Sequence, residues 1–336
     1  MKVAVFEAAN RLSIQDKPIP RLASGDVLVK VELCGVCASD LMALKGEITD
    51  YSPPVVMGHE VSGIVAESRH DSVKVGKRIT VNPMISCGKC RYCRNDLDKY
   101  CQKLYGIGHD IDGGYAEYLR VPKQAIENGC LLSVPDEIPA EEVMFVEALG
   151  CCLNAMRETI FRESVAILGA GSIGLTFVKL ARLKSLQTVV VEPLEHRRKM
   201  AEQVGANCVV DLDEIQKLMD ITNGGADTVI LATNNVNALA LMFKLAKRGA
   251  CLNFFGLFPK GNELKLELEE LHFMGYKILA SWAFSKWSMN EARRMIVEGD
   301  INFEGFLTHC FPLEKAVEAF KNAANRHGIK TALGRM

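Results

Sequence analysis

The sequence predicts an α/β protein with two domains, a mostly β domain followed by a doubly wound parallel sheet. Residues 1–150 carry short β-like runs separated by Gly, Pro and Asp, a spacing that is typical of a β domain such as a barrel. From about residue 165, apolar strands alternate with helical stretches, as they do in βαβ units. A length of 336 residues agrees with two domains of roughly 150 residues each.

The predicted elements follow from these patterns. Strand-like runs of the first domain include residues 27–31, 61–66 and 78–81. Six strands are expected in the second domain, at residues 165–168, 188–191, 208–210, 228–232, 251–255 and 278–282. Helices are expected between them at residues 173–183, 195–204 and 236–247, and beyond Trp287 at residues 289–298 and 313–325, before a short closing segment at 328–333. Six alternating strands of this kind favour a doubly wound sheet.

Composition and charge give no support to several classes of function. Forty basic and 41 acidic side chains give a formal net charge of −1, so no field gathers nucleic acid or anionic lipid, and neither partner is expected. No run reaches the roughly 20 apolar residues of a membrane helix, and the N-terminus has the pattern of a strand, not of a signal peptide. A cytoplasmic location is therefore predicted. Thiols stay reduced there, so twelve cysteines indicate metal binding.

A glycine-rich turn follows the strand at residues 165–168 and precedes a helix. Residues 169–174 read Gly-Ala-Gly-Ser-Ile-Gly, which places Gly169 in a tight turn, Gly171 where a pyrophosphate approaches the backbone, and Gly174 where helix and strand pack closely. The helix that begins near Ser172 and Ile173 would offer free N–H groups to phosphate. The turn therefore predicts a dinucleotide site.

An acid at the end of the next strand bears on which dinucleotide binds. Glu192 lies 23 positions after Gly169, where a carboxylate can accept hydrogen bonds from the adenosine ribose hydroxyls. The same carboxylate would repel a 2′-phosphate, so NAD is favoured over NADP. Arg197 and Arg198 follow closely and weaken this preference, and Arg197 is a candidate cofactor-binding residue.

Four cysteines follow a metal-binding spacing. Cys87, Cys90, Cys93 and Cys101 form a C-x2-C-x2-C-x7-C run. Four thiolates make a closed tetrahedral zinc site that leaves no position for a substrate. Iron–sulfur clusters use related runs, but the seven-residue gap and the absence of proline after Cys101 favour zinc. A structural zinc site that orders a polar loop is therefore expected.

A second set of potential ligands comes from two separate segments. Cys37 lies in the run Cys34-Gly-Val-Cys-Ala-Ser-Asp40, and His59 with Glu60 follows 22 residues later. A thiolate, an imidazole and a carboxylate are all zinc ligands, and three protein ligands with one open position is the catalytic arrangement. Taken singly, a buried apolar Cys37 and a hydrogen-bonded His59 are the simpler interpretations.

Together these motifs resemble the zinc-dependent medium-chain dehydrogenases, and among them the polyol (sorbitol-type) dehydrogenases. The resemblance covers the 35–40 run, Gly58-His59-Glu60, the four-cysteine lobe, residues 112–118 and the chain from Gly169 to Glu192. It implies a GroES-like barrel domain with a zinc-binding lobe, formed by residues 1–152 and 285–336, and a Rossmann domain that binds NAD, formed by residues 153–284. It also implies a homotetramer or homodimer.

The resemblance further implies roles for single residues. Cys37 and His59 match two catalytic zinc ligands, and Glu60 matches an acid that ligates the metal or lies beside it. Ser39 matches the residue that takes the substrate's hydroxyl proton, and Asp40 matches an acid that orients the zinc-bound histidine. Further along the chain, Glu147 stands where polyol dehydrogenases carry an acid, and is expected to bind zinc directly or through water; Cys151 and Cys152 are its rivals.

One position departs from the resemblance. Many relatives carry a histidine three residues after the position of Ser39, where it passes the proton to solvent, and here that residue is Met42. The expected function is reversible oxidation of a secondary alcohol of a polyol, a sugar alcohol that can be phosphorylated, or a cyclitol, with one catalytic and one structural zinc. Alternatives are the same chemistry on threonine or another alcohol, or a non-catalytic protein that binds zinc and nucleotide.

Overall fold

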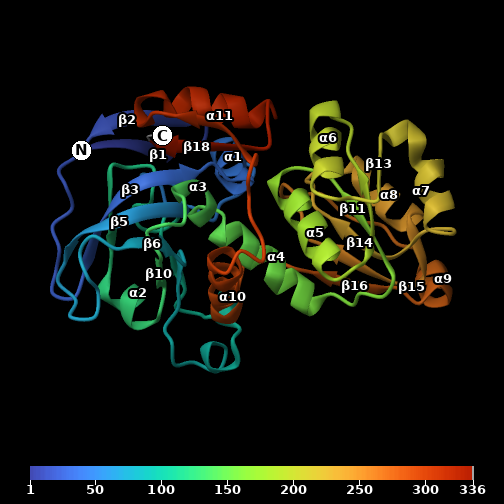
Figure 1. Ribbon diagram of the computed structural model, residues 1–336, viewed down its shortest axis with the longest axis horizontal. Coiled ribbons are helices and arrows are strands. Elements are labelled where there is room, and N and C mark those ends of the chain that lie inside the picture. The colour runs from blue at the N-terminus through green and yellow to red at the C-terminus, as the bar shows by residue number, and fades with distance from the viewer. Residues whose placement is uncertain (335–336) are drawn as a thin grey trace. The chain divides into compact units, whose positions relative to one another are not determined.

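The computed structural model describes residues 1–334 and divides into two compact units. The first unit comprises residues 1–151 together with the chain from Phe284 onward, and the second comprises residues 152–283. Helix α4 (Val146–Glu158) begins in the first unit and ends in the second. The last part of the chain therefore belongs to the same unit as the N-terminus, as Figure 1 shows by colour.

The first unit is built mainly of antiparallel strands. Its largest sheet has the strand order β10-β6-β5-β3-β18-β17, with a seventh strand, β9, also paired with β3. The members of this sheet are β3 (Val27–Gly35), β5 (Glu60–Ser68), β6 (Arg78–Val81), β9 (Tyr118–Val121), β10 (Leu131–Val134), β17 (Leu307–Phe311) and β18 (Lys330–Gly334). The predicted closing segment is thus largely an inner strand of this sheet, between β3 and the edge strand β17.

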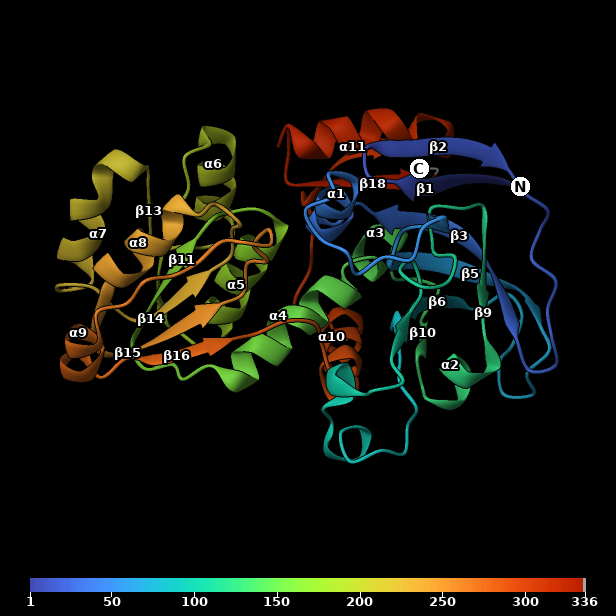
Figure 2. The ribbon, with the colours of Figure 1, turned by 180° about the vertical axis from the view of Figure 1, so that it is seen from behind.

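Smaller elements complete the first unit. A second sheet has the order β2-β1-β4, and a two-stranded sheet pairs β7 with β8. Their bounds are β1 (Lys2–Ala8), β2 (Arg11–Asp16), β4 (Val55–Val56), β7 (Met84–Ile85) and β8 (Tyr105–Gly106). The helices are α1 (Ala38–Leu44), α2 (Lys123–Glu127), α3 (Ala140–Val143), α10 (Lys286–Val297) and α11 (Ala316–Ala324). Helix α11 lies beside β1 and β2 in both views (Figure 1, Figure 2).

Buried apolar side chains hold the first unit together. Val27, Leu28 and Val29 of β3 are all buried, whereas Lys30 is exposed. Tyr115 and Phe320 meet edge to face with ring centroids 5.6 Å apart, which packs α11 on the segment before β9.

The second unit is a doubly wound parallel sheet with the order β13-β12-β11-β14-β15-β16. Its strands are β11 (Ser164–Leu168), β12 (Gln187–Val191), β13 (Cys208–Val210), β14 (Ala226–Leu231), β15 (Ala246–Phe254) and β16 (Lys277–Ala280). Its helices are α5 (Ser172–Leu183), α6 (Glu195–Gln203), α7 (Ile215–Ile221), α8 (Asn237–Lys244) and α9 (Leu268–Met274). Helices α5 and α6 cover one face, and α7, α8 and α9 cover the other (Figure 1, Figure 2).

The predicted fold class is confirmed, and all six predicted strands of the parallel sheet are present. The helix predicted over residues 236–247 is wrong at its end, because Ala246 begins β15 by pairing with Ala226. Helices α7 and α9 were not predicted. Both are seven residues long, and α9 has no buried side chain, so neither carries a sustained apolar period.

No helix within residues 1–334 is both long enough and apolar enough to cross a membrane.

Candidate metal centres and cofactor turn

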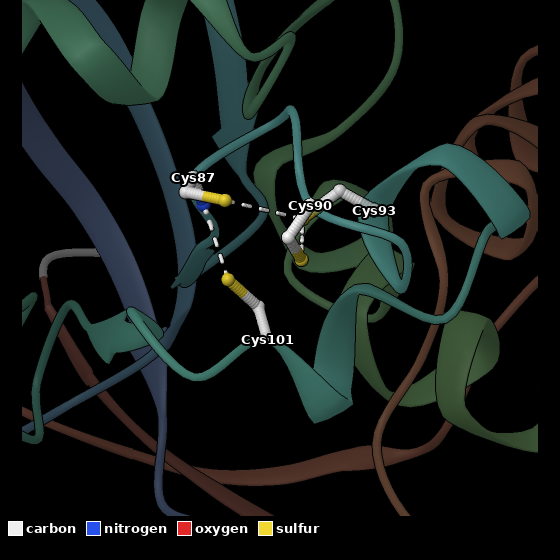
Figure 3. Close-up of side chains that lie close together, drawn as sticks. All are labelled: Cys87, Cys90, Cys93 and Cys101. Atoms are coloured by element: carbon white, nitrogen blue, oxygen red, sulfur yellow. Dashed lines mark hydrogen bonds between the residues drawn. The ribbon is translucent and has the colours of Figure 1, made fainter.

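The four predicted cysteines of the lobe converge on one point. They lie in the loop between β7 and β8, and their Sγ atoms are all within 4.8 Å of one another (Figure 3). Cys93 Sγ lies 3.4 Å from Cys90 Sγ and 3.8 Å from Cys87 Sγ. At a Zn–S distance of about 2.3 Å, the sulfur atoms of a regular tetrahedron are about 3.8 Å apart. The cluster therefore fits a tetrahedral zinc ion.

Backbone N–H groups around the cluster favour the deprotonated thiolate form of two of these cysteines. The N–H groups of Lys89 and Cys90 lower the pKa of Cys87 to about 6, and the N–H of Cys93 lowers the pKa of Cys90. Burial instead raises the pKa of Cys93 to about 11. Metals bind the thiolate form of cysteine. The backbone geometry of the loop therefore favours the metal-binding form of Cys87 and Cys90.

A buried acid attaches this lobe to the rest of the first unit. Asp98 accepts a hydrogen bond of 2.7 Å from Ser86 Oγ, just before the first cysteine, and lies 3.5 Å from the ammonium of Lys286 at the start of α10. Trp287 N–H also donates to Asp96 Oδ1 at 3.3 Å. The lobe is thus fixed at both ends by polar contacts and has little apolar core of its own.

The second predicted ligand set also comes together. The donor atoms of Cys37, His59 and Glu60 lie within 4.8 Å of one another, and His59 and Glu60 are buried. Strand register explains the meeting, because Gly35 of β3 pairs with Glu60 of β5. Cys37 follows β3 by two residues and is the residue before helix α1. A thiolate, an imidazole and a carboxylate that converge in a buried site fit a zinc ion.

A buried lysine that the sequence did not reveal accompanies Glu60. Lys330 Nζ lies 2.6 Å and 2.5 Å from the two carboxylate oxygens, and both side chains are at most 5% exposed. Strand β18 brings Lys330 there because Ala332 pairs with Gly35. A Cβ on Gly35 would lie 2.0 Å from Glu60 Oε2 and 2.8 Å from Lys330 Cε, so the pair needs glycine at this position. Burial opposes its charge, but Glu60 raises the pKa of Lys330.

Asp40, in the first turn of α1, is a fully buried acceptor. Its carboxylate accepts hydrogen bonds from Tyr115 Oη (2.6 Å), Tyr51 Oη (2.8 Å) and Cys37 N–H (3.1 Å). His59 Nδ1 lies 3.7 Å from Asp40 Oδ1, too far for a direct hydrogen bond, and has no other partner among the described residues. Burial lowers the pKa of His59, but Asp40 and Cys37 outweigh it and raise that pKa well above its usual value.

Glu147 lies in the first turn of α4 and is buried, but it is not one of the three converging donors. Cys151 Sγ donates to its Oε1 at 3.4 Å, and burial raises the pKa of Glu147. Cys152 belongs to the second unit, where its Sγ donates to the carbonyl of Ile173 at 3.9 Å. Glu60 thus converges with Cys37 and His59, and the role of Glu147 as a ligand stays a prediction.

Two further side chains near the candidate site were not assigned from the sequence. Tyr51 lies in the loop between α1 and β4, and its hydroxyl is 3.2 Å from Ser39 Oγ. His109 stacks on Tyr51 with centroids 4.1 Å apart, and its ring centroid lies 5.1 Å from that of His59. Burial and His59 lower the pKa of His109 to about 4. Long-range packing decides these positions, and no spacing rule could have found them.

The glycine-rich turn has the geometry expected for a phosphate site. Gly169 follows β11 with φ of +99°, a conformation that favours glycine. A Cβ on Gly174 would lie 1.9 Å from Gly169 O, so helix and turn pack too closely for any side chain. Within the described chain, a Cβ on Gly171 would meet a single atom within 4 Å, Arg197 Nη1 at 3.6 Å. The turn before α5 is therefore open for a ligand and has a cation beside it.

Glu192 ties this turn to the end of β12. Its Oε2 accepts the N–H of Ala170 at 2.7 Å, and its Oε1 accepts the N–H of Leu194 at 3.0 Å. Arg198 donates to the carbonyl of Glu192 at 2.9 Å and to Asp211 Oδ2 at 2.9 Å. Arg198 is thus engaged in the loop after β12, whereas Arg197 lies at the turn. The buried Glu192 carboxylate is held at the edge of the predicted dinucleotide site.

Comparison with known proteins identifies zinc-binding dehydrogenase domains over most of the chain. Residues 23–135 match the alcohol dehydrogenase GroES-like domain, and residues 172–298 match the zinc-binding dehydrogenase domain. The D-arabitol-phosphate dehydrogenase of Enterococcus avium is 28% identical over 96% of this chain and 94% of its own. The L-threonine 3-dehydrogenase of Pyrococcus furiosus is 30% identical over 90% of this chain and 89% of its own.

A solved structure shows the same fold over the whole chain. A protein of Sinorhizobium meliloti 1021, described as a zinc-binding dehydrogenase and bound to NADP, is 30% identical with a TM-score of 0.91, covering 99% of each chain. These matches confirm the resemblance drawn from the motifs. The chain belongs to the zinc-dependent alcohol dehydrogenases of the medium-chain family and is an alcohol oxidoreductase.

Proposed function

We propose that this protein reversibly oxidises a secondary alcohol of a polyol, of a sugar alcohol that can carry a phosphate, or of a cyclitol, using zinc and NAD. The proposal rests on one observation, which is that the donor atoms of Cys37, His59 and Glu60 converge. Ser39 lies close by in sequence, at the start of helix α1. These three side chains would hold the catalytic zinc, and the four cysteines of the lobe would hold a structural one. Glu147 is proposed to contact the same metal directly or through water.

Each group at the site would have a distinct role in the reaction. Zinc held there would supply Lewis-acid polarisation of the substrate oxygen, and a bound nicotinamide would supply the hydride acceptor. Ser39 would accept the hydroxyl proton as the first member of a relay and pass its own proton to the next member. Lys330 neutralises Glu60 and holds it toward Cys37 and His59.

The residues of the turn favour NAD. Gly169, Gly171 and Gly174, with the backbone N–H groups at Ser172 and Ile173, would receive the pyrophosphate, and Arg197 would lie beside it. The Glu192 carboxylate would accept the ribose hydroxyls and repel a 2′-phosphate. NADP is the less favoured cofactor, although the Sinorhizobium relative was solved with it.

A second candidate is the same reaction on threonine or another simple secondary alcohol. The 30% identity to L-threonine 3-dehydrogenase supports it about as strongly as the arabitol-phosphate relative supports a polyol. Both candidates use the same metal site, so only the substrate distinguishes them.

The decisive experiment is a turnover assay that follows reduced nicotinamide with NAD and then with NADP. The panel contains sorbitol, D-arabitol and its phosphates, myo-inositol, L-threonine and 2-butanol, and zinc is measured in the same sample. Turnover of a polyol with two zinc ions per chain would support the proposal, and turnover of threonine alone would transfer it to the second candidate.

Other outcomes bear on the sites themselves. One zinc per chain that is lost in a Cys90→Ser variant would mean that the catalytic site stays empty, which favours a non-catalytic protein. Two zinc ions without turnover on the whole panel would contradict the proposed substrate class. The homotetramer or homodimer and the cytoplasmic location stay predictions, and light scattering of the purified protein tests the first.

A further inference from the structure

The hydroxyl of Tyr51 links two residues beside the candidate catalytic site. Tyr51 Oη lies 2.8 Å from Asp40 Oδ1 and 3.2 Å from Ser39 Oγ. Tyr51 is 7% exposed, and Asp40 is fully buried. The three groups therefore form one hydrogen-bonded chain within the first unit.

The direction of each hydrogen bond follows from the number of protons. Three donors are directed at the Asp40 carboxylate, namely the hydroxyls of Tyr51 and Tyr115 and the N–H of Cys37, so Asp40 acts as an acceptor. Tyr51 has a single phenolic proton, and the carboxylate is the stronger acceptor. That proton therefore points to Asp40, and the phenolic oxygen accepts from the Ser39 hydroxyl.

This arrangement determines what Ser39 can offer a substrate. A serine hydroxyl has one proton and two lone pairs. When its proton points to Tyr51, only lone pairs remain for another partner, so Ser39 can accept a hydrogen bond from an alcohol but not donate one.

We propose that Tyr51 is a positioning residue that fixes the Ser39 hydroxyl as an acceptor for the alcohol hydroxyl of the substrate. The inference rests on the proposed role of Ser39 as the group that takes that proton. On α1 itself, Met42, three residues after Ser39, is apolar and 3% exposed. The loop after α1 supplies the polar partner instead.

Packing holds the Tyr51 ring in place for this role. His109 stacks on it with an interplanar angle of 21°, and Phe6 meets its edge with centroids 6.2 Å apart. Ser52 N–H donates to the carbonyl of His109 at 2.9 Å, which ties the two loops together. A clamped ring leaves its hydroxyl one position, so the direction of the Ser39 proton does not depend on a mobile side chain.

The kinetic test compares Tyr51→Phe with Tyr115→Phe. Both changes remove a hydroxyl that donates to Asp40, but only Tyr51 also contacts Ser39; the phenolic oxygen of Tyr115 instead lies 2.9 Å from Gly35 O. Using the panel alcohol that turns over fastest, Tyr51→Phe should lower kcat about tenfold, the effect of one lost hydrogen bond, with KM unchanged within about twofold. Tyr115→Phe should keep kcat within about twofold, whatever it does to Tm.

A double-mutant cycle separates this inference from the function on which it rests. Ser39→Ala should lower kcat about a hundredfold, and adding Tyr51→Phe should cost nothing more, since the hydroxyl to be oriented is gone. Wild-type kcat in Ser39→Ala would refute the proposed role of Ser39. A large loss in Ser39→Ala together with a full additional tenfold loss in the double variant would refute only the positioning role of Tyr51.

A neutron structure of the deuterated, zinc-loaded protein tests the same inference without a substrate. The deuteron of Ser39 should lie on the line from Oγ to Tyr51 Oη, and the deuteron of Tyr51 should point to Asp40. A Tyr51 deuteron directed at Ser39 would overturn the proposal.

Discussion

The two candidate metal centres of the first unit are built in different ways. The lobe takes all four of its ligands from residues 87–101, and three of the four cysteines are only partly buried. The centre at Cys37 takes its ligands from two segments, buries His59 and Glu60, and needs a strand from the end of the chain to neutralise Glu60. A local site depends on loop geometry, whereas the assembled site depends on the register of β5, β3 and β18.

This difference predicts which losses affect chemistry and which affect folding. The lobe has no room for a substrate once four thiolates surround a metal, so its loss should appear in stability. The assembled site keeps a coordination position for substrate, so its loss should appear in turnover. Four substitutions test the comparison, in order of decreasing effect.

Cys37→Ser should abolish chemistry while sparing the lobe. Removing one of the three converging ligands should lower turnover by at least about a thousandfold, equivalent to several kcal/mol of transition-state stabilisation. Zinc content should fall from two ions to one per chain, as measured by mass spectrometry of the metal. Cys208→Ser, at a cysteine of β13 outside both clusters, is the control and should keep both ions. Near-normal turnover of Cys37→Ser would break the comparison.

Cys90→Ser should instead lower stability and leave turnover nearly unchanged. Loss of the lobe's zinc should lower Tm by roughly 5–10 °C, because a structural zinc contributes directly to folding. Hydrogen exchange should speed up in residues 87–101, while turnover per zinc-loaded catalytic site stays within about threefold. An unchanged exchange pattern in the loop would show that the lobe is ordered without metal.

In the zinc-free protein, Lys330→Met should destabilise the first unit by about 3 kcal/mol, because it leaves Glu60 buried without its cation. Chemical denaturation measures the free energy of unfolding. Glu60→Gln introduced into Lys330→Met should recover part of the loss, since it removes the unpaired charge. A double variant as unstable as Lys330→Met would contradict this explanation.

Lys286→Met is the matched change beside the lobe and should have the smallest effect, less than about 1 kcal/mol. Lys286 is 33% exposed and lies 3.5 Å from Asp98, so solvent screens the pair. The same denaturation measurement applies. A loss equal to that of Lys330→Met would show that burial does not distinguish the two centres.

Several features of this protein could be predicted from the sequence alone. The four-cysteine lobe and the turn from Gly169 to Gly174 are encoded by spacing within a few residues, so local geometry is sufficient to specify them. The six strands of the parallel sheet carry continuous apolar runs and were found. Short helices such as α7 and α9 were missed because a seven-residue element shows barely two turns of a helical period.

Tertiary structure alone decided the surroundings of the assembled site. Lys330 reaches Glu60 because β18 pairs with β3, a contact across 270 residues that no local pattern records. Tyr51 reaches Ser39, and His109 reaches Tyr51, through packing of separate loops. Ligand types follow from residue chemistry and spacing, but partners of a buried ligand follow from strand register, which is a property of the folded chain.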